Sequence, residues 1–175
     1  DLVSGIENNV AFKASDAYGA PVKISGTLHD ASGKNILEFS SVHDGMGQFM
    51  ISPAKTDVLY ATWKDGKGLE HRTDLPAVKS SGIVLRAANH HGKLVFSVAR
   101  QPDNTAYQKL IVMAHMNQQM VYKAIVNLKD NFMSGGNIPT AQLPTGILTI
   151  TVFDINDMPM AERVVFVNNH DYRFD

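Results

Sequence analysis

The sequence predicts an all-β protein made of two antiparallel β-sandwiches in series. The chain is rich in Val, Ile and Thr, which favour the pleated surface of a sheet. Gly and Pro recur at short intervals, as they do where short strands are joined by turns. At 175 residues the chain has room for one domain or two small ones, and its apolar periodicity stops and restarts near the middle.

Composition excludes several classes of function. Apolar residues make up 44% of the chain and charged residues 19%, which suits a packed core. The formal net charge of −1 offers no basic surface for nucleic acid. No apolar run approaches the roughly 20 residues of a membrane helix. We therefore expect no nucleic-acid partner and no direct membrane insertion.

The chain contains no cysteine. Thiol catalysis, a thiolate metal site, an internal thioester and a disulfide framework are therefore all excluded.

Two similar turns organise the first half of the chain. The pattern Asp-Ala-x-Gly occurs at 16–19 and again at 30–33. An aspartate can bond its own backbone two residues further on, and glycine supplies a positive φ, so both segments are expected to be loops. The strands expected around them cover residues 10–14, 22–28, 35–40, 47–51, 58–63 and 70–74, with Ile24, Leu28, Phe49 and Tyr60 in the core.

The best boundary between the two halves lies at residues 76–82, which contain a proline, two serines and a glycine. We therefore expect a first domain at 1–78 and a second at 79–175.

The second half repeats the pattern of short strands. Leu148, Ile150 and Val152 alternate with threonines, which predicts a half-buried strand. The apolar run 164–167 suits a strand buried on both faces, and a helical turn fits best at 140–143. The other strands are expected at 83–87, 94–100, 109–115 and 120–127, with Leu148, Ile150, Val152, Val165 and Val167 in the core.

No motif points to catalysis or to a metal. The seven histidines include no His-x-His or His-x-x-x-His pair, and no calcium loop of the Asp-x-Asp-x-Asp-Gly type is present. A nucleophile elbow, a phosphate loop and paired carboxylates at an aromatic cleft are also missing. We predict no catalytic residues, no metal and no cofactor, and therefore no enzyme.

Aromatic residues offer the one recognisable binding hypothesis. Trp63, Tyr18 and Tyr107 are candidates for stacking against a sugar ring. Trp63 and Tyr60 lie three apart in one expected strand and so on opposite faces, which leaves core packing as the alternative for at least one of them.

Motifs across most of the chain resemble a recurring domain of Bacteroidetes envelope proteins. In that family an aromatic Pro-Glu-Gly-Gly segment precedes the Asp-Leu-Val found here at 1–3, so the resemblance implies a fragment of a larger protein. The matching motifs are residues 1–6, 10–14, 43–49, Pro53, 60–61, 138–140, 143–147, 151–154 and 159–168.

The resemblance implies tandem immunoglobulin-like or macroglobulin-like sandwiches. Such pairs occur in outer-envelope proteins described as TonB-dependent receptor plug or carboxypeptidase-regulatory-like proteins. It implies a non-catalytic scaffold or protein-binding module in the periplasm or at the outer membrane, with other domains of the same protein and an outer-membrane protein as partners. A carbohydrate-binding module of a glycan-uptake system, using Trp63, Tyr18 and Tyr107, is the alternative.

Overall fold

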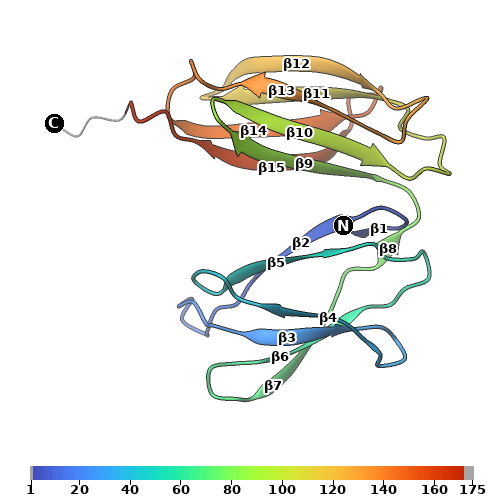
Figure 1. The fold of residues 1–175 in the computed structure, drawn as a ribbon, viewed down its shortest axis with the longest axis vertical. Helices are drawn as coiled ribbons and strands as arrows, with labels where there is room; N and C mark the ends of the chain where they lie inside the picture. The colour runs from blue at the N-terminus through green and yellow to red at the C-terminus, as the bar shows by residue number, and fades with distance from the viewer. Residues whose placement is uncertain (1, 172–175) are drawn as a thin grey trace. The chain divides into compact units, whose positions relative to one another are not determined.

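The computed structural model describes residues 2–171, and this part of the chain contains strands and no helix (Figure 1). The all-β prediction is therefore confirmed. The chain divides into two compact units, Asp1–Ser80 and Ser81–Asp175, where the sequence predicted a boundary after residue 78.

The second unit is a complete seven-stranded sandwich. One sheet has the order β13-β10-β9 and the other β12-β11-β14-β15, with antiparallel neighbours throughout. In an immunoglobulin-type sandwich the first, second and fifth strands likewise face the third, sixth and seventh. The strands are β9 (Ile83–His90), β10 (Lys93–Arg100), β11 (Lys109–Met116), β12 (Gln119–Asn127), β13 (Met133–Pro139), β14 (Gly146–Phe153) and β15 (Pro159–Val167).

The first unit repeats this strand order without one strand. Its sheets are β2-β5 and β4-β3-β6-β7, so that β2 to β7 correspond to β10 to β15. Among the described residues no counterpart of β9 pairs with β2, and the short β1 pairs in parallel with β8. The strands are β1 (Leu2–Val3), β2 (Asn8–Lys13), β3 (Ser25–His29), β4 (Asn35–Ser40), β5 (Met46–Ile51), β6 (Tyr60–Lys64), β7 (Glu70–Asp74) and β8 (Val78–Lys79).

The two cores differ in size. The second contains sixteen buried apolar residues, among them the predicted Leu148, Ile150, Val152 and Val167, with Val165 packed against it. The core of the first contains only Leu2, Leu28, Ile51 and Leu59 in its buried cluster. The first sandwich is therefore less completely filled.

The predicted place of Tyr60 in the first core is wrong. Ala61 is buried and pairs with the buried Leu28, so the neighbouring Tyr60 points to the outer face of the sheet. There its ring stacks on His29, and the Arg72 guanidinium lies 3.7 Å from the ring centroid. Trp63 and Tyr60 do lie on opposite faces, as predicted.

Three further expectations are corrected. The run 164–167 is not buried on both faces, because β15 is an edge strand and leaves Val164 60% exposed. Residues 140–143 form a single turn, closed by Leu143 N–H and the Thr140 carbonyl, rather than helix. Strand β13 was not predicted because it contains Gly135 and Gly136, and glycine is unusual inside a strand. Glycine is needed there, since a Cβ at Gly135 would collide with the Phe96 backbone of β10.

Four loops are built on one carboxylate arrangement, and the Asp-Ala-x-Gly prediction for two of them is confirmed. In each loop one aspartate oxygen accepts the backbone N–H groups two and four residues further on. The fourth residue has a positive φ, and it is glycine in three loops and Asp157 in the last. The loops begin at Asp16, Asp30, Asp65 and Asp154.

These hydrogen bonds make the free energy of unfolding depend on pH. Hydrogen bonds from the Ser32 hydroxyl and the Lys34 N–H lower the pKa of Asp30, and those from the Met158 and Asn156 N–H groups lower the pKa of Asp154. A carboxylate with a lowered pKa in the folded state stabilises the fold above its unfolded pKa and loses this contribution as the pH falls through the folded one.

We therefore expect Asp154→Asn to be less stable than the parent protein at about pH 7 and to lose less stability on acidification to about pH 3. Urea unfolding followed by far-UV circular dichroism measures both values. Asp103→Asn, at an exposed aspartate, is the matched control. An equal acid loss in the parent and in Asp154→Asn would contradict the argument.

A buried arginine fixes one end of the second unit. Arg100 is 6% exposed, and its guanidinium donates to backbone carbonyls rather than to a carboxylate. Because a guanidinium carries five N–H donors in a planar fork, one side chain can satisfy several carbonyls at once. The acceptors are Leu128, Gln101, Pro102, Asn104 and Lys129, at 2.6–3.5 Å.

We expect Arg100→Lys to lower the free energy of unfolding by about 3 kcal/mol, because one ammonium cannot reach all these carbonyls and stays buried. Urea unfolding provides the measurement. Arg163→Lys, at an exposed arginine, should change stability by less than about 0.5 kcal/mol. Equal effects of the two substitutions would show that the carbonyl contacts contribute nothing.

Candidate functional site

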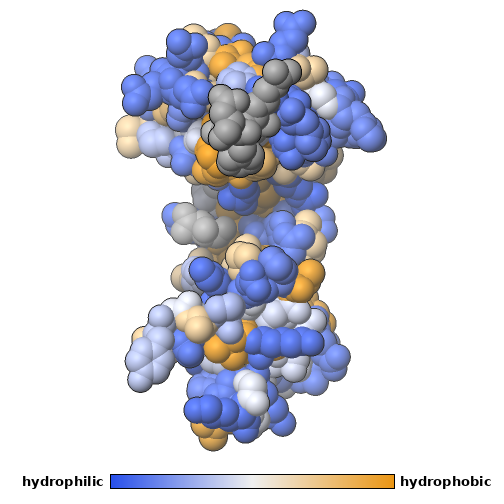
Figure 2. Space-filling model, turned by 90° about the vertical axis from the view of Figure 1, so that its left-hand side faces the viewer, coloured by the Kyte–Doolittle hydropathy of each residue, from blue (hydrophilic) through white to orange (hydrophobic). Residues whose placement is uncertain are grey.

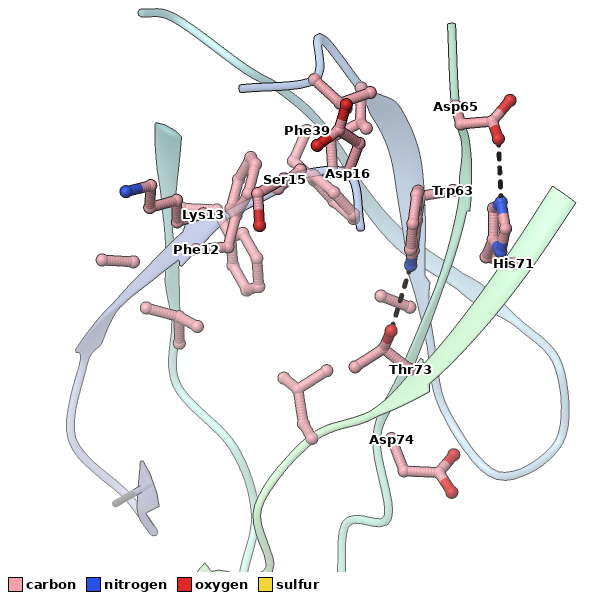
Figure 3. Close-up of a pocket in the computed structure, with 18 of the residues that line it drawn as sticks. Phe12, Lys13, Ser15, Asp16, Phe39, Trp63, Asp65, His71, Thr73 and Asp74 are labelled. Carbon is pink, nitrogen blue, oxygen red and sulfur yellow. Dashed lines mark hydrogen bonds and ion pairs between the residues drawn. The ribbon is translucent and has the colours of Figure 1, made fainter. Parts of the chain in front are cut away.

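The first unit contains a groove of about 760 Å³. It lies between β2 with the following segment to Ile24 on one side, and β6 with β7 on the other. We call it the β2–β7 groove; Figure 3 shows its side chains.

The floor of the β2–β7 groove is aromatic. Phe12 from β2, Phe39 from β4 and Phe49 from β5 all point into the space between the two sheets. The Phe12 and Phe39 rings meet edge to face with centroids 5.1 Å apart, and those of Phe39 and Phe49 lie 5.4 Å apart. These are core-type side chains, and here they also border an open space.

On the opposite wall, side chains of β6 and β7 hold the Trp63 indole in place. Trp63 on β6 faces His71 on β7, and their rings stack with centroids 4.2 Å apart. The Trp63 Nε1–H group donates to the Thr73 hydroxyl at 3.0 Å, and His71 Nε2 lies 3.2 Å from an Asp65 carboxylate oxygen (Figure 3). The contacts of Trp63 with His71 and Thr73 fix the plane of the indole ring.

Asp65 is one of the charged residues of this wall, beside Lys67 and Asp74. Desolvation acts to raise the pKa of Asp65, but the hydrogen bonds from His71 and from the Leu69 and Lys67 N–H groups outweigh it, so the pKa lies below the ordinary value. The carboxylate is thereby held ionised beside His71.

This arrangement is not that of a hydrolytic triad. The His71 ring contacts Asp65 through Nε2 and Trp63 through its face. In the described part of the chain no serine or threonine hydroxyl is hydrogen-bonded to His71, while a nucleophile needs a base within that reach. The contacts instead position a tryptophan.

One side of the groove is an open strand edge. The Ala14 N–H donates to the Gly45 carbonyl at 2.9 Å, which continues the β2–β5 ladder. Hydrogen-bonded positions alternate in antiparallel pairs, so the N–H and C=O groups of Asn9, Ala11 and Lys13 point away from β5. Among the described residues no strand pairs with this edge of β2.

The three predicted stacking residues have different surroundings in their own units. Trp63 lines the β2–β7 groove, with one ring face against His71. Tyr18 is 96% exposed in the loop at Asp16 and lies outside the groove lining. Tyr107 belongs to the second unit, where it packs against the core with a φ of 61°.

Sequence reasoning missed Phe12, Phe39 and His71 as groove residues. Phe12 and Phe39 have the in–out alternation of ordinary core positions, and nothing in that pattern tells a filled core from an open one. The pairing of Asp65 with His71 across a hairpin was detectable in principle, because six residues around a Gly-Lys-Gly turn bring them to one face.

Other clusters of titratable groups do not form a candidate site. His43 and Asp44 are 3.0 Å apart but strongly exposed. Within the described residues no group of three or more His, Asp or Glu side chains is arranged to hold a metal ion. Nor does that part of the chain have a helix long and apolar enough to cross a membrane.

The surface visible in Figure 2 has no broad apolar face. On each unit the apolar residues there form small separate patches within a mostly hydrophilic surface. Isolated exposed apolar residues are normal in monomeric proteins. The β2–β7 groove is therefore a better docking candidate than the surface in this view.

Comparison with known proteins shows no family. No family model matches the chain, and no curated protein matches it. Similar solved structures include a tetra-tandem repeat from the extending region of a large adhesion protein (11% identity, TM-score 0.41), covering 94% of this chain and 50% of that one. The present chain thus spans half the length of that structure.

Two further structures are less similar. A two-domain fibronectin type III segment of chicken tenascin is 10% identical with a TM-score of 0.34, over 95% of both chains. The major pilin subunit BcpA of Bacillus cereus, as the D312A variant, is 9% identical with a TM-score of 0.29, over 92% of this chain and 69% of the other. Identities and TM-scores this low bear on neither family nor function.

The Trp63–His71 stack makes a spectroscopic prediction. Trp63 is the single tryptophan of the chain, and one face of its indole lies against the His71 ring. We expect His71→Ala to expose that face to water and to shift the emission maximum to longer wavelength. His115→Ala, at an exposed histidine of the second unit, should leave the emission unchanged. An unchanged emission in His71→Ala would contradict the contact.

Proposed function

We propose that the chain is a non-catalytic scaffold that binds another protein through the β2–β7 groove of its first unit. The observation that carries this proposal is the groove itself, about 760 Å³ of open space lined by aromatic residues that face the interior of a sandwich. Concave apolar surfaces with a few fixed polar groups are the usual form of a binding site.

In this proposal the two units have different roles. The second unit has a core of sixteen buried apolar residues, covered at its edge by β9, which suits a spacer. The first unit presents Trp63 in a fixed orientation, three phenylalanines and the open edge of β2. These features favour a polypeptide, whose backbone can use the edge while its side chains enter the groove.

The sequence resemblance supports the finer part of the proposal. The proposal, as the resemblance implies, is a module of a larger bacterial envelope protein, in the periplasm or at the outer membrane, with an outer-membrane protein among its partners. A sugar-binding module remains the competing function, but the platform it requires is incomplete, since one face of Trp63 lies against His71 and Tyr18 and Tyr107 lie elsewhere.

A two-sided binding screen tests the proposal. The immobilised chain is offered a phage-displayed library of random peptides and, separately, a glycan array. We expect peptide enrichment that is lost in Thr73→Arg, which places a long cation across the groove. Thr105→Arg, at an exposed threonine of the second unit, is the matched control and should leave enrichment unchanged.

Two results would overturn the proposal. Glycan binding that disappears in Trp63→Ala, without peptide enrichment, would assign the chain to carbohydrate recognition. Peptide enrichment that survives Thr73→Arg would move the binding surface away from the β2–β7 groove.

A further inference from the structure

The second unit shows which element occupies the place of the β2–β7 groove when a sandwich is complete. There β9 pairs antiparallel with β10 along eight residue pairs, and Asn89 Nδ2 donates to the Phe166 carbonyl of β15 at 2.7 Å. Strand β9 thus runs between the counterparts of β2 and β7. Its Ile83 and Leu85 are buried in the core.

The same position in the first unit is open along its length. The groove is bordered by β2 and β7, which are both edge strands of their sheets in the described residues. Ala11 and Lys13 line the groove although their side chains belong to the outer face of β2, so the groove extends to the unpaired backbone edge. The site therefore offers backbone donors and acceptors next to apolar side chains.

We propose that an extended segment of a partner protein adds to the first unit as an antiparallel strand along β2 and completes its sandwich. This inference rests on the proposed function and names the form of the partner. The added strand bonds the free N–H and C=O groups of Asn9, Ala11 and Lys13, as β9 bonds β10 in the second unit. Every second side chain of the strand enters the groove above Phe12 and Trp63.

The chemistry of the partner follows from the groove. Its strand alternates apolar and polar residues over the six residues of β2. Lys13 and Lys67 line the end of the groove at which β2 finishes, and neither forms an ion pair in the described part of the chain. Asp16 and Asp65 line the groove as well, so the charges of the two lysines are balanced and the added strand needs no charged residue.

A second copy of this chain fits less well. Two β2 strands paired edge to edge would satisfy each other's backbone groups. However, each β2 already directs its own Val10 and Phe12 inward, so neither copy would supply side chains to the other's groove. Both grooves would stay unfilled, whereas a separate strand fills one completely.

The probe is an acetylated, amidated peptide that alternates Val or Ile with Thr. A scrambled peptide of the same composition is its control. Binding is followed by Trp63 emission and by amide hydrogen exchange of the whole chain. We expect the alternating peptide to bind, the scrambled one not to bind, and exchange at Asn9, Ala11 and Lys13 to slow.

A proline at the edge provides the decisive variant. Ala11→Pro removes one outward N–H from β2, and proline is tolerated on edge strands. It should weaken the alternating peptide about tenfold, the equivalent of one hydrogen bond at about 1.4 kcal/mol. Glu38→Pro is the matched control on β4, an edge strand on the far side of the four-stranded sheet from β7, and should leave binding unchanged.

The outcomes separate this inference from the proposed function. Peptide binding that perturbs Trp63 without protecting the β2 amides would leave a protein-binding groove and overturn strand addition. Exchange in the parent protein gives this answer even if Ala11→Pro fails to fold. Self-association by sedimentation equilibrium that protects the β2 amides in the absence of peptide would replace the partner strand by a second copy.

Discussion

The register of both sandwiches depends on a carboxylate that accepts two backbone N–H groups. This contact closes the β3–β4, β6–β7 and β14–β15 hairpins with loops of the same geometry. A strand has a side-chain period of two, so a slip of one residue in any of these loops would turn its apolar face outward. A few aspartates at the loop positions thus determine which residues reach the core, and only then can apolar burial stabilise the fold.

The two units show how one strand order can give a sealed or an open interior. Their four-stranded sheets are equivalent, and so are the β2–β5 and β10–β13 pairs. The difference is the strand at the edge: β9 covers the inter-sheet space in the second unit, while β1 turns to pair with β8 in the first. The aromatic residues exposed by this difference are those of an ordinary core, so the site arises from topology rather than from a special set of residues.

This origin explains what the sequence could predict. Alternation and turn chemistry are local signals, and they predicted most strands, the aspartate loops and the second core. They failed where a neighbouring strand determines the direction or size of a side chain. Tyr60 turns outward because Ala61 faces Leu28, and β13 contains two glycines because its backbone lies against Phe96. The β2–β7 groove was unpredictable for the same reason, since no local pattern around Phe12 reports which strand lies beside it.

The carbonyl acceptors around Arg100 limit how the second unit can be altered. They come from the segment after β10 and from the residues after β12, so the length of each segment is matched to the reach of one side chain. An inserted tag or foreign peptide at 101–104 or 128–129 would withdraw carbonyls from a buried cation. In the exposed loop that carries Tyr18, the Asp16 carboxylate accepts the Tyr18 and Ala20 N–H groups at the surface, so an insertion there takes no partner from a buried charge. This loop is the natural place to graft a label or an epitope onto this protein.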